Sequence, residues 1–289
     1  PIAYLDENGI TVIANSWAKV GESETFSEIT YTVVDLETLR EMIGLDKNVT
    51  TVITSKITDM TNLFEGKPNF NQNLKTWDVS NVKDFTNMFI DSKDFNQDIS
   101  MWDTSSAINL TGMFKNTKSF NQSLSNWNVQ NVTNFTETFY GSETFDKELT
   151  WDVRGATTME GMFQNSVYDQ DLPNWNVSNV INFKSMFEGS KFNKDISYWD
   201  TSSATTLERM FKSNWEFNQD IGSWNISNVT SLRYTFSDSD FSQDIGSWDT
   251  SKVTDFSATF MTNRSFSGEI SKWDTSSAEL MWYMFMNAC

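Results

Sequence analysis

An aromatic repeat with an interval of 24 or 25 residues constrains the fold of this chain more than any other feature. Tryptophan recurs at Trp77, Trp102, Trp127, Trp151, Trp175, Trp199, Trp224, Trp248 and Trp273. Two further aromatic series follow the same repeat, one from Phe64 to Phe285 and one from Phe70 to Phe266, which has a single interval of 23 residues between Phe145 and Tyr168. A unit this short cannot bury its own rings, so successive units must stack and bury them against their neighbours. We therefore expect a repeat protein with a continuous aromatic core.

The apolar spacing inside one unit changes halfway along it. Ile99, Trp102 and Thr104 have the spacing of residues that face inward around a short strand. Leu110 and Phe114 follow at a spacing typical of one or two helical turns. These patterns predict an α/β fold, an LRR-like solenoid of about nine to ten units, each with a short strand and a short helix. Strands of neighbouring units would lie about 4.8 Å apart.

The first 48 residues do not follow the repeat. Asn8-Gly9 between two short apolar runs predicts a β-hairpin. Residues 29–34 are predicted to form a strand, and residues 36–43 a short amphipathic helix. We therefore expect an N-terminal α+β capping domain over residues 1–48, which closes the first unit of the repeat.

The repeat domain is expected to cover residues 49–289. The last residues, from Trp282 onwards, stop where the next unit would begin. An uncovered aromatic end promotes aggregation, and we expect the repeat to continue beyond residue 289.

Composition argues against several classes of function. The net charge of −18 disfavours nucleic acid, since phosphate binding needs a basic surface, and it also disfavours anionic lipid. There is no histidine, and Cys289 is the only cysteine, so an internal disulfide or a zinc–thiolate cluster cannot form. No apolar run reaches the roughly 18 residues of a membrane-spanning helix. The sequence also lacks Ser–His and Cys–His pairs and a Gly-rich phosphate loop. We expect no enzymatic activity, no cofactor and no membrane insertion.

The repeat unit resembles a known family. FNQDISMWDTSSAINLTGMF (95–114) and FNQDIGSWNISNVTSL (217–232) are similar to the BspA-type leucine-rich-repeat surface proteins of bacteria. The resemblance covers residues 48–289, and YLDENGITVIAN (4–15) resembles the leader of marine-bacterial members. It implies a secreted or cell-surface protein that binds a protein or glycan on another cell or matrix. The position of the buried asparagine of leucine-rich repeats holds Val82 or Ala107 here, which is a departure from that family.

Each position of the unit becomes a column of residues when the units stack. The residue after each tryptophan, which we term the aspartate column, is Asp or Asn throughout and includes Asp103 and Asp200. Asp and Asn both accept a hydrogen bond from the backbone N–H two residues on, so a turn-forming role is favoured over ligand binding. The residue before each tryptophan, the variable column, differs from unit to unit and is expected beside it on a strand-lined face. Met101 and Tyr198 are the strongest candidate anchors there, and Trp215, in a variable turn, is the tryptophan most expected to be exposed.

An acidic column occupies the position four residues before the tryptophan. Its members are Glu148, which is three residues before Trp151, and Asp171, Asp195, Asp220, Asp244 and Glu269. Neighbouring carboxylates at strand spacing would repel by about 1 kcal/mol each in water. Outward splay, salt, the nearby Lys147 and Lys194, or bound calcium would relieve this repulsion. We favour a solvated column and assign no metal site.

Three functional hypotheses remain. The first is an adhesion or ligand-binding module that uses the strand-lined face, with Met101, Asp103, Tyr198, Asp200 and Trp215 as candidate binding residues. The second is a passive spacer that presents a distal domain. Ice binding is the third, but the column two residues after the tryptophan mixes Val and Thr and is expected to point inward. In each case we expect a monomer.

Overall fold

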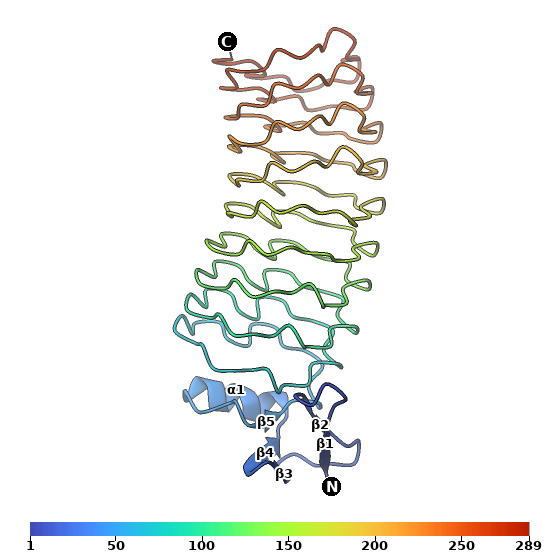
Figure 1. The fold of residues 1–289 in the computed structure, drawn as a ribbon. Helices are drawn as coiled ribbons and strands as arrows, with labels where there is room; N and C mark the ends of the chain where they lie inside the picture. The colour runs from blue at the N-terminus through green and yellow to red at the C-terminus, as the bar shows by residue number, and fades with distance from the viewer. Residues whose placement is uncertain (289) are drawn as a thin grey trace.

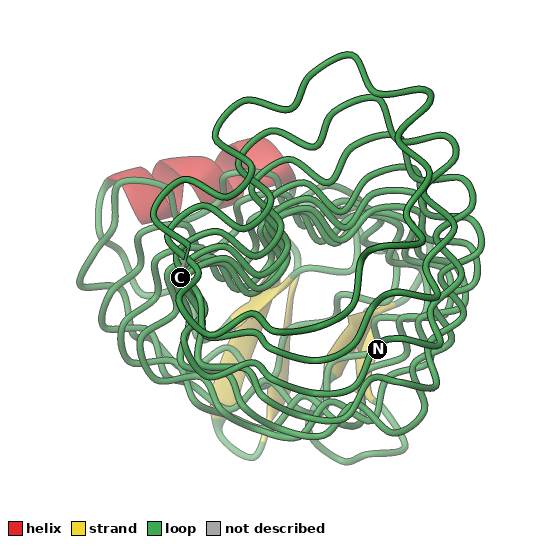
Figure 2. Cartoon of the chain, turned by 90° about the horizontal axis from the view of Figure 1, so that it is seen from above, coloured by secondary structure: helices red, strands yellow, loops and turns green. Residues whose placement is uncertain are grey.

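The computed structural model describes residues 1–288, so Cys289 lies outside the described part. In Figure 1 the short helix and the strands gather at the N-terminal end, and the rest of the chain winds upward from them as a stack of coils. Figure 2, viewed along this stack, shows the coils lying over one another. The fold therefore has one short region of regular secondary structure and a long region that is built from turns.

Two small sheets form the N-terminal region. Strands β1 (Ala3–Leu5) and β2 (Val12–Ala14) pair antiparallel around Gly9, whose φ is 69°, and they confirm the predicted hairpin. The other sheet has the order β3-β4-β5 and consists of β3 (Ser23–Phe26), β4 (Ile29–Val33) and β5 (Val52–Ile53). Strand β4 is antiparallel to β3 and parallel to β5. Strand β5, the last before the coils, is thereby hydrogen-bonded to the N-terminal region.

Helix α1 (Leu36–Gly44) lies against the first coil (Figure 1). The side chain of Asp35 caps it by accepting a hydrogen bond of 2.8 Å from the N–H of Thr38. Leu39 and Ile43 are buried in the same apolar core as the coils, so this helix covers the end of the aromatic stack. Within residues 1–288 no helix is long and apolar enough to cross a membrane.

A backbone ladder joins each coil to the next through the half of the unit that was predicted to be helical. Leu110 N–H donates to Asn134 O (3.0 Å), Gly112 N–H to Thr136 O (2.8 Å) and Phe114 N–H to Thr138 O (2.9 Å). The same half carries an unbroken series of isolated parallel bridges, from Asp59↔Asp84 to Asp255↔Leu280. The N–H groups of the residues between these donors form turns within their own coil, as Met113 N–H does by donating to Leu110 O (3.1 Å).

The division of each unit into a strand and a helix is therefore wrong. Beyond β5, residues 54–288 contain no α-helix and no extended strand. The residue two before the phenylalanine has a positive φ, as in Gly112 (59°) and Arg209 (57°), which an α-helix does not permit. Successive turns bring the apolar side chains inward every three or four residues, as a helix would, and this explains why the spacing suggested one.

The half that was predicted to be a strand is joined to its neighbours through side chains. The indole N–H of Trp102 donates to Leu74 O of the preceding coil (3.1 Å). The hydroxyl of Thr104 donates to Asn128 O of the following coil (3.0 Å). This face is therefore not lined by strands, because its backbone groups do not form a ladder.

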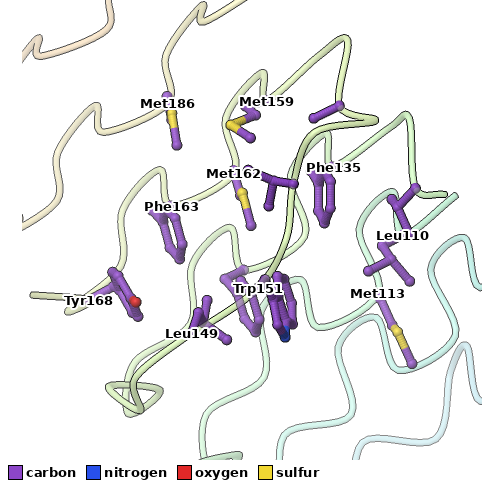
Figure 3. Packing of buried hydrophobic residues seen from close by; sticks show 14 of the residues in the cluster. Leu110, Met113, Phe135, Leu149, Trp151, Met159, Met162, Phe163, Tyr168 and Met186 are labelled. Carbon is purple, nitrogen blue, oxygen red and sulfur yellow. The ribbon is translucent and has the colours of Figure 1, made fainter. Parts of the chain in front are cut away.

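Aromatic rings fill the inside of the coils, as predicted. Trp151 is 1% exposed, and its ring lies 6.4 Å from that of Trp127 with 5° between the planes. Figure 3 shows Trp151 among other side chains of this core, including Phe135 and Leu149. The column two residues after the tryptophan also points inward, and its Thr104 is buried. Such buried threonines do not form the surface ladder that ice binding would require.

A second ladder, which the sequence did not predict, runs along the stack through one position of the unit. This position is the residue directly after the phenylalanine of the FNQ motif. We term this second ladder the asparagine ladder. Asn96 N–H donates to the Asn71 side-chain oxygen (3.0 Å), and Asn121 N–H donates to that of Asn96 (3.0 Å). Asp146, Asp169, Asn193, Asn218 and Ser242 continue the same pattern. From Asn96 to Ser242, the N–H at this position therefore points toward the preceding coil.

Candidate functional site

The five candidate binding residues all lie on the surface, but the structure does not bring them together. Met101 is 42% exposed, Tyr198 51% and Trp215 53%, and Asp103 and Asp200 are also exposed. Asp103 belongs to the same coil as Met101, whereas Tyr198 and Asp200 lie four coils further along. Trp215 lies in the link between Phe211 and Phe217, outside the aspartate column and the variable column. The candidate site is thus a strip along the stack, without Trp215.

The aspartate column has the turn-forming role that was predicted for it. The side-chain oxygen of Asp103 accepts a hydrogen bond from Ser105 N–H (2.9 Å), and that of Asp200 accepts one from Ser202 N–H (3.0 Å). The Ser202 hydroxyl and its N–H hold the pKa of Asp200 below its ordinary value. The same contact occurs at Asp78, Asn128, Asp152, Asn176, Asn225, Asp249 and Asp274. One carboxylate oxygen of each exposed aspartate is thereby committed to a turn.

The variable column and the acidic column, which the sequence does not place together, meet on one face. Near the C-terminal coils they line a groove of about 480 Å³. Its walls include Asp220, Asp244 and Glu269 of the acidic column and Ser223, Ser247 and Lys272 of the variable column. We term this surface the acidic groove.

The acidic groove is rich in hydrogen-bond acceptors. The backbones of Gly222 and Asp244 lie close together, since a Cβ on Gly222 would be 2.6 Å from the backbone oxygen of Asp244. The hydroxyl of Ser247 is engaged as a donor to Gly222 O (2.7 Å). Asp220 uses one oxygen to accept Gly222 N–H (2.9 Å), which leaves its other oxygen available. Ligand groups that donate hydrogen bonds, such as hydroxyls and ammonium groups, match this surface.

Tyr198 lies in the variable column, one coil before Ser223. Its hydroxyl donates to Leu172 O of the preceding coil (2.5 Å), and burial raises its pKa. The polar end of this side chain therefore joins two coils, and the half-exposed ring is the part that a ligand can contact. Met101 offers an exposed apolar surface in the same column.

Backbone hydrogen bonds hold several carboxylates of the acidic column. Ser197 N–H donates to Asp195 (2.9 Å), and this bond, followed by the Ser197 hydroxyl, holds the pKa of Asp195 below its ordinary value. Lys194 pairs with Asp169 of the asparagine ladder (3.0 Å) and not with the acidic column. Among residues 1–288 no three potential metal-ligating residues are grouped so as to hold a metal ion.

Comparison with known proteins places the chain in one family. A family model described as "Mycoplasma protein of unknown function, DUF285" matches residues 36–151, 147–240 and 228–289. These three consecutive matches show that the chain is a repeat protein, and the first one includes α1. Neither a curated protein nor a solved structure matches the chain. Because the matches together run from residue 36 to residue 289 of 289, the chain belongs to the DUF285 family.

Proposed function

We propose that this protein is a secreted or cell-surface repeat protein that binds a protein or glycan on another cell or matrix. In this proposal the coils form an LRR-like solenoid related to the BspA-type surface proteins. The binding surface is the face formed by the variable column and the acidic groove. It replaces the strand-lined face that the sequence suggested.

The observation that carries the proposal is the contrast between the buried tryptophan of each coil and the exposed residue that directly precedes it. The tryptophans are buried and invariant, while the residues just before them are exposed from Met101 to Lys272 and place methionine, tyrosine and lysine among recurring Ser, Thr and Asn. A surface whose side chains differ from coil to coil can distinguish between ligands, and a long row of coils supplies many contacts. Exposed Met and Tyr side chains beside acceptor groups are typical of recognition surfaces.

The chemistry of the acidic groove favours a ligand that is rich in hydrogen-bond donors. Asp220, Asp244 and Glu269 offer carboxylate oxygens, and Lys272 is a cation on the same wall. The hydroxyls of a glycan, or lysine and arginine side chains of a protein, would satisfy these oxygens. Binding without catalysis is proposed because the acids belong to repeated columns and use an oxygen in turns, as Asp220 does.

The test starts by probing glycan and protein arrays with the chain and measuring the Kd of each hit. The variant Ser223→Lys with Ser247→Lys should weaken binding at least about tenfold by filling the acidic groove. The column accommodates lysine, since Lys272 occupies the equivalent position.

A matched control adds the same two charges on another face. Thr205 and Thr230 also donate their hydroxyls to a carbonyl of the preceding coil, and Lys83 occupies the equivalent position of an earlier unit. Thr205→Lys with Thr230→Lys should leave Kd unchanged. Equal weakening by both variants would show that charge alone is responsible and would contradict a binding role for the groove.

The alternative function is a passive spacer. The same ladder hydrogen bonds join every coil, which suits a stiff rod. For a spacer, the arrays would give no saturable hit.

A further inference from the structure

The asparagine ladder leaves one backbone donor without an acceptor at its first position. From Asn96 to Ser242, each N–H of this ladder donates to the side chain of the preceding coil, as Asn96 does to Asn71 (3.0 Å). Asn71 is the first member, and no group within residues 1–288 accepts a hydrogen bond from its N–H. By the geometry of the ladder, this N–H points to the side of the stack where α1 lies (Figure 1).

A cleft of about 630 Å³ opens at this point, between the end of α1 and the first coil. Its lining includes Ile43 and Lys47 from the α1 side and Lys67, Phe70, Asn71 and Gln72 from the coil. This volume is within the range of about 300–1,000 Å³ that is usual for small-molecule sites. The repeat itself does not create this cleft, since it lies where a preceding coil would otherwise stack.

Polar side chains fix the walls of the cleft. Gln72 accepts a hydrogen bond from Val49 N–H (2.8 Å) and donates one to Lys47 O (3.0 Å). Lys67 pairs with Asp46 across the cleft (2.6 Å). The position of Lys67 holds a small hydroxyl residue in the next two coils, so this ion pair is specific to the first coil. The ammonium group of Lys47 has no carboxylate within salt-bridge distance among the described residues.

An aromatic ring supplies the apolar wall. The ring of Phe70 stacks on those of Phe64 (3.9 Å) and Phe95 (6.1 Å). Both aromatic partners of Phe70 therefore belong to the coils and not to the α1 side of the cleft. Phe95, which has aromatic rings of its column on both sides, is completely buried, whereas Phe70 is only partly buried and lines the cleft. The stack of rings therefore ends at the cleft with a partly uncovered phenylalanine.

We propose that this cleft binds a small aromatic carboxylate. The ligand's ring continues the stack on Phe70, and its carboxylate accepts the Asn71 N–H and pairs with the Lys47 ammonium. Such a ligand supplies what a preceding coil would supply, namely an aromatic ring followed by an acceptor oxygen. The cleft is at the N-terminal end of the stack, so it is independent of the acidic groove.

The probe is 3-phenylpropionate, titrated to about 20 mM against the full chain, well above the millimolar Kd expected of so small a ligand. Isothermal titration calorimetry gives Kd, and ¹H–¹⁵N correlation spectra locate the site. We expect a saturable shift of the Asn71 amide. The neutral 3-phenylpropionamide should bind at least about tenfold more weakly, because a charged acceptor makes the stronger hydrogen bond.

Two variants with matched controls test the contacts. Lys47→Gln and Phe70→Leu should each weaken binding about tenfold. Lys93→Gln, at an exposed lysine elsewhere, and Phe266→Leu, at a partly buried member of the Phe70 column, should leave Kd unchanged. Lys47 is exposed, so its variant is expected to fold even if Phe70→Leu does not.

Three outcomes would overturn the proposal. They are the absence of a saturable shift at Asn71, equal affinity for the amide, and an unchanged Kd in Lys47→Gln.

Discussion

Replacing Trp151 by alanine tests whether the aromatic stack is the main source of stability. This side chain is 1% exposed, and its ring lies 5.9 Å from Phe135 as well as close to Trp127. Its indole N–H donates to Leu124 O of the preceding coil (2.8 Å). The change Trp151→Ala therefore opens a cavity in the middle of the stack and removes one of the two hydrogen bonds that Leu124 O accepts, the other coming from Trp127 N–H (3.0 Å).

The expected loss follows from the buried area. A tryptophan side chain buries about 200 Å², which at about 25 cal/mol per Å² corresponds to about 5 kcal/mol as an upper bound. Measured tryptophan-to-alanine changes in cores cost about 3–5 kcal/mol, and we expect this range for Trp151→Ala. Trp215 is 53% exposed, so Trp215→Ala removes about half of that area and should cost no more than about 2.5 kcal/mol.

Urea unfolding followed by far-UV circular dichroism measures both free energies of unfolding. The m-value should be compared as well, because in a repeat stack a mid-stack defect can separate the unfolding of the two halves. Equal losses at the two tryptophans would refute the assignment of one to the core and the other to the surface.

Three further predictions concern polar groups. The hydroxyl of Tyr168 is buried without a hydrogen-bond partner in a column otherwise made of phenylalanine, so Tyr168→Phe should leave the urea-unfolding free energy unchanged or raise it by about 1–3 kcal/mol; a clear loss would contradict this. Asp195→Asn with Asp220→Asn should raise the melting temperature at low salt by relieving repulsion while keeping the turns, and millimolar calcium should shift the wild-type melting temperature no more than sodium chloride of equal ionic strength. The pKa of Asp200 is held below 3.8, so its stabilising contribution is complete above that pH and is lost as pH falls through the folded-state pKa. Asparagine makes the same turn at Asn176 and Asn225, so Asp200→Asn should lose little stability at neutral pH. Because asparagine does not titrate, the variant should show a shallower acid unfolding curve, and an unchanged acid limb would count against this contact.

The sequence was sufficient to predict the parts of the fold in which one physical requirement determines residue type. A buried ring that is covered by the next coil's ring must recur at a fixed interval, and Trp151 and Phe163 follow that rule. The hairpin at Gly9 and the helix that begins after Asp35 also have local signals, a positive φ and an N-cap. These elements were predicted because their causes lie within a few residues.

The turns of the coil were not predictable from apolar spacing, because turns and helices both bring a side chain inward every three or four residues. Gly112 hints at the required positive φ, but Arg209 and Tyr234 hold the same conformation without any glycine signal. The asparagine ladder did have a signal, the recurring FN pair at Asn71 and Asn96. That signal lies outside the position that asparagine occupies in leucine-rich repeats, so the resemblance to that family did not predict the ladder. The acidic groove and the cleft beside α1 depend on how coils stack, which no single unit specifies.

The backbone ladder gives the stack an electrical direction. Three or more N–H groups of a coil donate toward the following coil, as Leu110, Gly112 and Phe114 do, while others, such as those of Thr133 and Asn121, donate back to Ile108 O and to the Asn96 side chain. Aligned peptide dipoles add as they do in a helix, so carbonyl oxygens face the N-terminal end. There the guanidinium of Arg40 in α1 donates to Thr61 O (2.6 Å), as a cation does at the C-terminus of a helix. Because one side of each coil presents mainly acceptors and the other mainly donors, the coils stack on one another head to tail.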